Sequence, residues 1–332
     1  MPPHNTMWGA MLTILFLAIS PGPAYSQGCA GPADGQTLIC YTESWSPVEE
    51  ASTCGCSHLV LPPIQLDNTF SVIDVESVSA ESPAGLRRAL SIGSDLASGR
   101  LAQLVTSSTD LDNLVDSVKQ TMKDVAAEGV EVDASWISSS KDKRNLEKLL
   151  KALSPLTTDQ LLVRLPAEAN QLTAIGDLSD LSQLTDRLIL ATPPAESRDR
   201  PETAQLAPLM GDGAQAESVD ALLDVLISLG APAEKLVMTI PSYGYMYQLQ
   251  QTHVTSPGSP ALPGTEKLSR KEMCNMFTPD WLEDRNDDMT APYAYHYLSW
   301  VAYEDELSVA VKVRRESVTN GMVCLFESQL LA

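Results

Sequence analysis

The stretch that decides the fold is Glu128-Gly129-Val130-Glu131-Val132-Asp133-Ala134-Ser135-Trp136, which follows a segment of helical periodicity. Its valines alternate with acids, as in a short buried β-strand. Because strand side chains alternate between two faces, we expect Glu131, Asp133 and Ser135 on one face and the intervening apolar residues on the other. Enzymes built on barrels keep their chemistry on the inward face at the carboxyl ends of the strands, and two acids placed there would shift each other's pKa.

The rest of the chain alternates strand-like apolar runs with helical patterns, which predicts a parallel sheet or barrel. A helical pattern from Leu111 to Val125 leads into the stretch 128–136, and a second one begins near Lys141. Further strand-like runs lie at 38–41, 58–61, 89–94, 161–165, 188–191 and 322–325.

Composition excludes several classes of function. The 332 residues include 22 basic and 43 acidic ones, for a formal net charge of −21. This balance argues against nucleic acid and anionic membranes as partners. The four histidines form no ligand cluster, so we expect no metal site and no cofactor.

The first 26 residues are expected to be a secretory signal. Met7–Ile19 is mostly apolar but too short to span a bilayer, and Pro21-Gly22-Pro23 interrupts it. Ala24-Tyr25-Ser26 fits a cleavage site, so the mature chain would begin at Gln27 and be extracellular, with no later membrane span. An uncleaved anchor is the alternative. In an oxidising compartment the six cysteines would form three disulfides, whose pairing spacing alone does not decide.

The stretch 128–136 resembles the signature strand of glycoside hydrolase family 18, the chitinases and chitinase-like proteins. That signature is Asp-Gly-x-Asp-x-Asp-x-Glu, so Glu128, Glu131 and Asp133 stand at its three aspartates. Ser135 stands at the glutamate, which is the proton donor of the family. A serine hydroxyl cannot act as a general acid near neutral pH as a carboxyl of raised pKa can. The resemblance therefore implies the relic of a catalytic site.

Ordered blocks between residues 38 and 326 carry the same resemblance. It implies a (β/α)8 TIM barrel over residues 27–332, with 248–292 as a small, abbreviated α+β insertion between the seventh and eighth barrel strands. The blocks are Cys40-Tyr41-Thr42-Glu43-Ser44-Trp45, Ser91-Ile92-Gly93, the segment from Leu229 to Tyr245, Glu272-Met273-Cys274 and the segment from Pro292 to Lys312.

Other catalytic groups of the family are replaced as well. Active relatives end the sixth strand with Met-Thr-Tyr-Asp, whose tyrosine and aspartate hold the N-acetyl group of the substrate, whereas this chain has Ala191-Thr192-Pro193-Pro194. The tryptophan that floors the sugar pocket would fall at Cys324 or Leu325. Retaining chitinases need these groups because the acetamido oxygen of the substrate attacks the anomeric carbon while the acid protonates the leaving oxygen. The resemblance thus implies a non-catalytic protein.

The disulfides are also suggested by the resemblance. Chitinase-like proteins tie the first barrel strand to the second, which pairs Cys40 with Cys56. A second local bond would join Cys29 to Cys54, and Cys274 with Cys324 would be the remaining pair.

The leading hypothesis is a secreted pseudoenzyme that binds chitin or related N-acetylglucosamine-containing glycans. One alternative is a secreted scaffold for a protein partner, in an immune or growth-factor-like role, and another is a weak residual chitinase. Glu131 and Asp133 could instead form a hydrogen-bonded network without a ligand. Aromatic residues near predicted strand ends could stack on sugars or serve as barrel packing, and the candidates are Tyr41, Trp45, Trp136, Tyr243, Tyr245 and Trp300.

Overall fold

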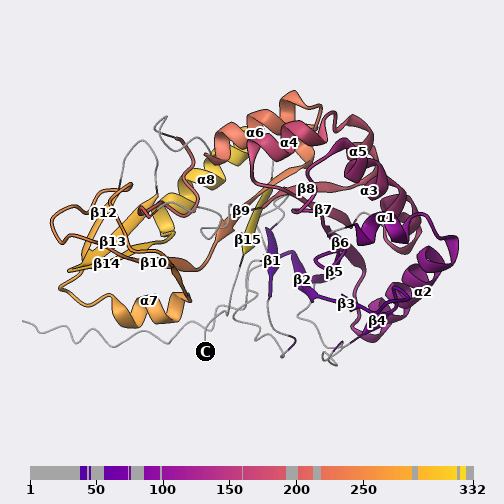
Figure 1. Cartoon of the computed structure of the whole chain (residues 1–332), viewed down its shortest axis with the longest axis horizontal. Helices are drawn as coiled ribbons and strands as arrows, with labels where there is room; N and C mark the ends of the chain where they lie inside the picture. Colours follow the sequence, from indigo (N-terminus) through magenta and orange to yellow (C-terminus); the bar gives the residue numbers. More distant parts are fainter. Residues whose placement is uncertain are drawn as a thin grey trace, which may run out of the picture.

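The computed structural model describes residues 38–42, 45, 56–73, 75, 86–97, 99–158, 160–191, 201–211, 218–285, 291–319 and 322–326. Parallel strands close into a barrel in the order β1-β15-β9-β8-β7-β6-β5-β2 (Figure 1). The predicted (β/α)8 barrel is therefore confirmed. Its strands are β1 (Leu38–Tyr41), β2 (His58–Pro63), β5 (Arg87–Ile92), β6 (Gly129–Asp133), β7 (Leu161–Leu165), β8 (Arg187–Leu190), β9 (Leu236–Pro241) and β15 (Met322–Phe326).

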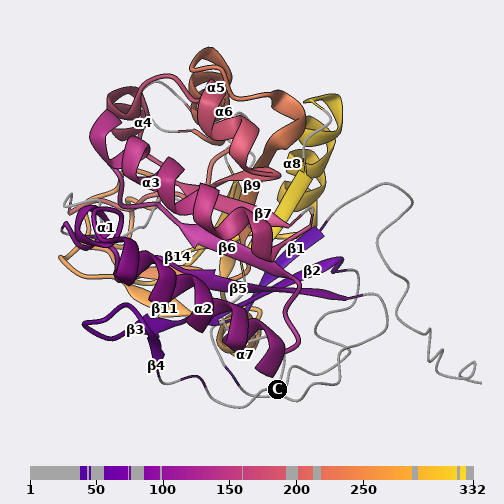
Figure 2. The same ribbon diagram turned by 90° about the vertical axis from the view of Figure 1, so that its right-hand side faces the viewer.

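Helices cover the outside of the barrel, as the view in Figure 2 shows for α2, α3 and α6. Three of them begin at a serine whose side chain accepts a hydrogen bond from a backbone N–H of the first turn: Ser107, Ser139 and Ser218. The helices are α1 (Arg100–Leu104), α2 (Ser108–Asp124), α3 (Ser140–Leu153), α4 (Ala169–Ile175), α5 (Ser179–Leu184), α6 (Val219–Ser228) and α8 (Glu306–Thr319), with the 3-10 turns η2 (Ser154–Leu156) and η4 (Ala233–Lys235).

The core has two layers, because the barrel strands bury both faces. Outward residues such as Val130 and Val132 of β6 pack against helix residues such as Leu146 and Leu149 of α3. The inward residues form a separate, smaller cluster of Ile39, Tyr41, Val60, Ala89, Leu162, Ile189 and Val237. The inner layer lacks an apolar residue from β6, since Glu131 and Asp133 occupy that face.

A small antiparallel sheet lies beside the barrel and comes from the chain between β9 and β15 (Figure 1). It spans Gly244 to Ala302, which is wider at both ends than the predicted 248–292. Its strand order is β11-β10-β14-β13-β12. The elements are β10 (Gly244–Gln248), β11 (Glu266–Leu268), α7 (Arg270–Met276), β12 (Leu282–Arg285), β13 (Pro292–His296) and β14 (Ser299–Ala302), and a separate two-stranded ribbon pairs β3 (Gln65–Leu66) with β4 (Val72–Ile73).

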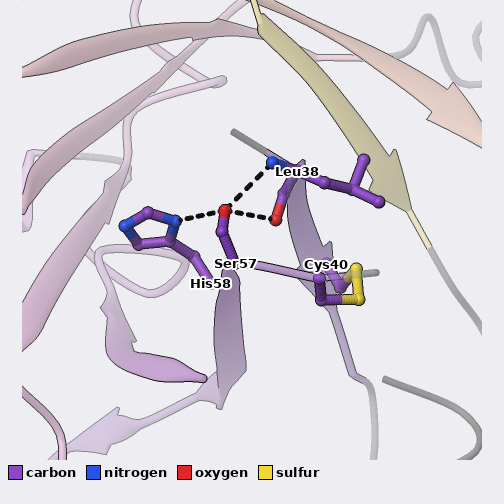
Figure 3. Close-up of a disulfide and its surroundings, with 5 residues drawn as sticks. Leu38, Cys40, Ser57 and His58 are labelled. Atoms are coloured by element: carbon purple, nitrogen blue, oxygen red, sulfur yellow. Dashed lines mark hydrogen bonds between the residues drawn. A yellow bond between two sulfur atoms is a disulfide. The ribbon is translucent and has the colours of Figure 1, made fainter. Parts of the chain in front are cut away.

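The cysteines follow the prediction in part. A disulfide joins Cys40 of β1 to Cys56 just before β2, as predicted (Figure 3). Cys274 on α7 is instead a free, exposed thiol, so the predicted bond with Cys324 is wrong. The two residues belong to different sheets, because α7 packs on the small sheet while Cys324 lies on β15 between β1 and β9.

Several predictions fall outside the described residues. These are the signal at 1–26, the bond between Cys29 and Cys54, and the prolines Pro193 and Pro194. Within the part of the chain that the structure describes, no helix combines the length and the apolar character needed to cross a membrane.

Candidate functional site

The inward face of β6 places two acids inside the barrel. Glu131 is fully buried and Asp133 is 7% exposed. The strand register sets Ser91 of β5 on one side of Glu131, and Arg164 of β7 beside Asp133. The alternation expected for Glu131 and Asp133 is therefore observed. The cluster formed by Tyr41, Ser91, Glu131, Asp133 and Arg164 is called the barrel cluster below.

Three groups surround the carboxylate of Glu131. The Ser91 hydroxyl donates to Oε2 at 2.5 Å, the Tyr41 hydroxyl donates to Oε1 at 3.4 Å, and Nε of Arg164 lies 3.3 Å from Oε1. Burial, assisted by the nearby Asp133, raises the pKa of Glu131 to about 7 although Arg164 and the two hydroxyls lower it. Glu131 is thus held between its charged and neutral forms near neutral pH.

Arg164 is the group that sequence reasoning missed. Its Nη2 lies 2.5 Å from Oδ2 of Asp133, and its guanidinium lies 5.5 Å from the centre of the Tyr41 ring. Burial lowers the pKa of Arg164, but the carboxylates of Glu131 and Asp133 outweigh burial and raise it above its ordinary value. The sequence did contain a signal for this partner, because a single arginine lies inside the apolar run at 161–165. A buried arginine requires a buried counter-charge to offset its desolvation.

The turn after β6 holds Ser135, which therefore does not lie on the inward strand face as predicted. The strand ends at Asp133, and the backbone N–H of Ser135 donates to Asp133 Oδ1 at 3.0 Å. The indole N–H of Trp136 donates to the carbonyl oxygens of Gly93 and Asp133, each at 3.0 Å. Gly93 has φ of +107°, and a Cβ added there would lie 2.7 Å from the carbonyl oxygen of Asp133. Only glycine allows this close approach.

Glu128 does not belong to the barrel cluster. It precedes β6, at the opposite end of the strand from Asp133. Its side chain is 67% exposed, and Oε2 lies 3.8 Å from Nε of Arg87. Of the four residues predicted as the relic motif, only Glu131 and Asp133 therefore share the barrel interior.

The aromatic candidates fall into three groups. Tyr41 belongs to the barrel cluster, and Trp136 is half-buried beside it. Trp45 is also half-buried and packs against the outer core. Tyr243, Tyr245 and Trp300 belong instead to the core of the small sheet, where they share one apolar cluster.

Trp300 is a core residue and offers no ring face to a sugar, which corrects its prediction as a binding residue. It is fully buried, its ring stacks on Tyr293 with centroids 5.1 Å apart, and its Nε1 donates to the carbonyl oxygen of Thr255. Tyr243 and Tyr245 are 7% and 5% exposed and pack edge to face on each other. These rings fill the core of the small sheet.

The barrel cluster is a closed set of charge pairs. One guanidinium serves two carboxylates, and two hydroxyls complete the shell of Glu131. Such an arrangement can hold a proton on Glu131 and can stabilise the barrel mouth. Ser91, Tyr41 and Arg164 already contact the carboxylate of Glu131 and would compete with a ligand for its acceptor sites.

Comparisons with known proteins identify one family. The model of glycosyl hydrolases family 18 matches residues 37–322. The chain is 25% identical over 360 residues to Chitinase-3-like protein 2 of Homo sapiens, covering 94% of this chain and 87% of that protein. It is 29% identical over 200 residues to Probable chitinase 10 of Drosophila melanogaster, covering 54% of this chain but only 9% of that protein.

A solved structure has the same fold. The crystal structure of YKL-39 in the presence of chitooligosaccharides superposes with a TM-score of 0.73 and 22% sequence identity. The match covers 88% of this chain and 92% of the other.

Proposed function

Because the chain belongs to glycosyl hydrolases family 18, we propose that it is a secreted, non-catalytic member that binds chitin or related glycans containing N-acetylglucosamine. The observation that carries the proposal is the engagement of Glu131 and Asp133 by Arg164. The resemblance of the stretch 128–135 to the family signature, in which Ser135 corresponds to the proton donor, supports it. A glycosidase acid must reach the bridging oxygen of the substrate and release a proton to it. The barrel cluster directs its acids to an internal cation instead.

The competing function is weak residual hydrolysis through Glu131. The pKa of Glu131 near 7 favours it, since a carboxyl that keeps its proton near neutral pH suits a general acid. The position of Glu131 argues against residual hydrolysis. The side chain is fully buried and binds the Ser91 hydroxyl at 2.5 Å, so it would have to break this contact to meet a substrate. We therefore favour binding without cleavage.

Support for a glycan ligand comes from family membership and from residues near the barrel mouth. The YKL-39 structure was solved in the presence of chitooligosaccharides. In this chain, Trp136 follows the inward acids and is half-buried, so part of its ring remains accessible. An indole with its N–H already bound, here to Gly93 and Asp133, presents an apolar face to the C–H groups of a sugar.

The test combines binding and turnover on the purified protein. Calorimetric titration with chitohexaose is expected to show binding, and a chromogenic chito-oligosaccharide is expected to show no turnover. Glu131→Gln tests the residual activity, with Glu128→Gln as the matched control because Glu128 is an exposed acid of the same stretch. Turnover that Glu131→Gln abolishes and Glu128→Gln leaves intact would establish an enzyme. Absence of binding heat would favour the protein-partner scaffold.

A further inference from the structure

A run of rings connects the end of α7 with the tip of the hairpin between β13 and β14. Phe277 and Trp281 have centroids 5.0 Å apart, Trp281 and His296 5.6 Å, and His296 and Tyr297 4.5 Å. These four residues are called the aromatic row. Phe277 also contacts Tyr303, which is 9% exposed and anchors the row in the apolar cluster beneath α7.

The exposed end of the row has a strained backbone. Tyr297 lies in the two-residue turn that links His296 to Ser299, and its φ is +52°. This left-handed region favours glycine, because a Cβ there crowds the backbone. The Tyr297 side chain is nevertheless 75% exposed, so it contributes little burial to the fold in return. A two-residue hairpin turn requires a positive φ at this position and favours glycine, asparagine or aspartate there, so the presence of an exposed tyrosine points to a role for its ring.

We propose that the aromatic row is a glycan-binding surface, separate from the barrel cluster, for a neutral chain of N-acetylglucosamine units. The proposal rests on the proposed function and gives it a location. Rings of tyrosine, tryptophan and histidine combine apolar faces with polar edges, which suits a sugar that presents C–H faces and hydroxyl groups together. A neutral ligand also meets no repulsion from a chain of net charge −21.

Glu283 supplies a polar group on the same side of the sheet. It lies opposite Ala294 in the pairing of β12 with β13, so it shares a face with His296, two residues further along β13. Burial raises the pKa of Tyr303 above its ordinary range, and the Glu283 carboxylate contributes to this rise, which places Glu283 at the base of the row. Glu283 is exposed and can accept hydrogen bonds from sugar hydroxyl or amide groups.

The decisive variant is Tyr297→Gly, because its effects on folding and on binding have opposite signs. Glycine relieves the left-handed strain, so the melting temperature should stay constant or rise by up to a few degrees. Removal of the ring should weaken retention on colloidal chitin and binding of chitohexaose on the order of tenfold. Leu307→Ala is the matched control, since Leu307 is 56% exposed on α8 and outside the row.

A further variant, Trp136→Ala, separates the two locations. Weakened binding in Tyr297→Gly, with Leu307→Ala unchanged, supports the aromatic row. If Tyr297→Gly binds like the unmodified protein while Trp136→Ala loses binding, the barrel mouth is the site and the row is not, although the proposed function stands. If the unmodified protein binds neither colloidal chitin nor chitohexaose, both the row and the proposed function are overturned.

Discussion

The guanidinium of Arg164 on β7 donates to the carboxylate of Asp133 on β6, its direct neighbour across the parallel strand pair. The same guanidinium lies 3.3 Å from Glu131, so a single cation faces two acids inside the barrel. The attraction offsets the desolvation of all three charges only while the set is complete. The free energy of unfolding is therefore expected to depend on Arg164.

Arg164→Met should therefore destabilise the protein strongly. It leaves the two carboxylates of Glu131 and Asp133 buried without their cation, and the removal of one member of a buried charge pair typically costs about 3–5 kcal/mol. Urea unfolding at pH 8 measures the loss. Arg144→Met is the control, because Arg144 is exposed on α3 and should change the free energy of unfolding by no more than about 0.5 kcal/mol. Equal effects for the two variants would contradict the importance of the barrel cluster.

The raised pKa of Glu131 predicts a stability that falls as pH rises. Between the ordinary value of 4.5 and about 7, folded Glu131 binds more protons than unfolded Glu131, so proton release destabilises the folded state. From pH 5 to pH 8 the unmodified protein should lose on the order of 2 kcal/mol relative to Glu131→Gln. Urea unfolding at both pH values gives this difference. The free energy of unfolding of the control Glu128→Gln should change between the two pH values as much as that of the unmodified protein. If the free energy of unfolding of Glu131→Gln changes by that amount as well, the raised pKa of Glu131 is refuted.

His58, the first residue of β2, predicts the opposite dependence. Burial, assisted by Arg87 and Arg187, lowers the pKa of His58 from 6.5 to about 4, and Nδ1 lies 2.8 Å from the hydroxyl of Ser57 (Figure 3). Folded His58 resists protonation, so its contribution to stability is complete above pH 6.5 and is lost as pH falls toward 4.

The variant His58→Gln should remove this acid sensitivity. Between pH 7 and pH 5 the unmodified protein should lose on the order of 1 kcal/mol relative to the variant, once solvent screening of the partly exposed ring is included. Denaturant unfolding at the two pH values provides the measurement, and His253→Gln, on a histidine in an exposed loop, serves as the control. A His58→Gln protein that weakens in acid as much as the unmodified one would contradict the prediction.

The barrel itself was predictable because buried parallel strands are continuous apolar runs. The expected runs at 38–41 and 161–165 coincide with β1 and β7. The inward orientation of Glu131 and Asp133 also followed from alternation along a single strand. These features depend on local periodicity, which one segment of sequence contains.

The partner of the acids was not predictable in the same way. Arg164 lies on a different strand, and its contact with Asp133 depends on the register between β6 and β7, which neither segment specifies alone. The prediction of Trp300 as a binding residue was wrong for a related reason, because a position near a predicted strand end does not reveal which sheet the strand joins. The bond expected between Cys274 and Cys324 required two such placements at once, and the structure leaves Cys274 free.

A second buried ion pair joins Glu304, in the segment between β14 and α8, to Lys312 of α8, and it allows an experiment that separates charge from packing. Lys312 donates to Glu304, both side chains are almost fully buried, and the Ser308 hydroxyl donates to Glu304 at 2.6 Å. Lys312→Met leaves the buried Glu304 without its cation, so it should cost about 3–5 kcal/mol. Adding Glu304→Gln removes the charge while keeping an acceptor for Ser308, and should recover part of that loss. Chemical denaturation of the two single variants and the double variant measures the coupling. If the loss of free energy of unfolding in the double variant equals the sum of the losses in the two single variants, the two side chains are not energetically coupled and the ion pair does not contribute to stability.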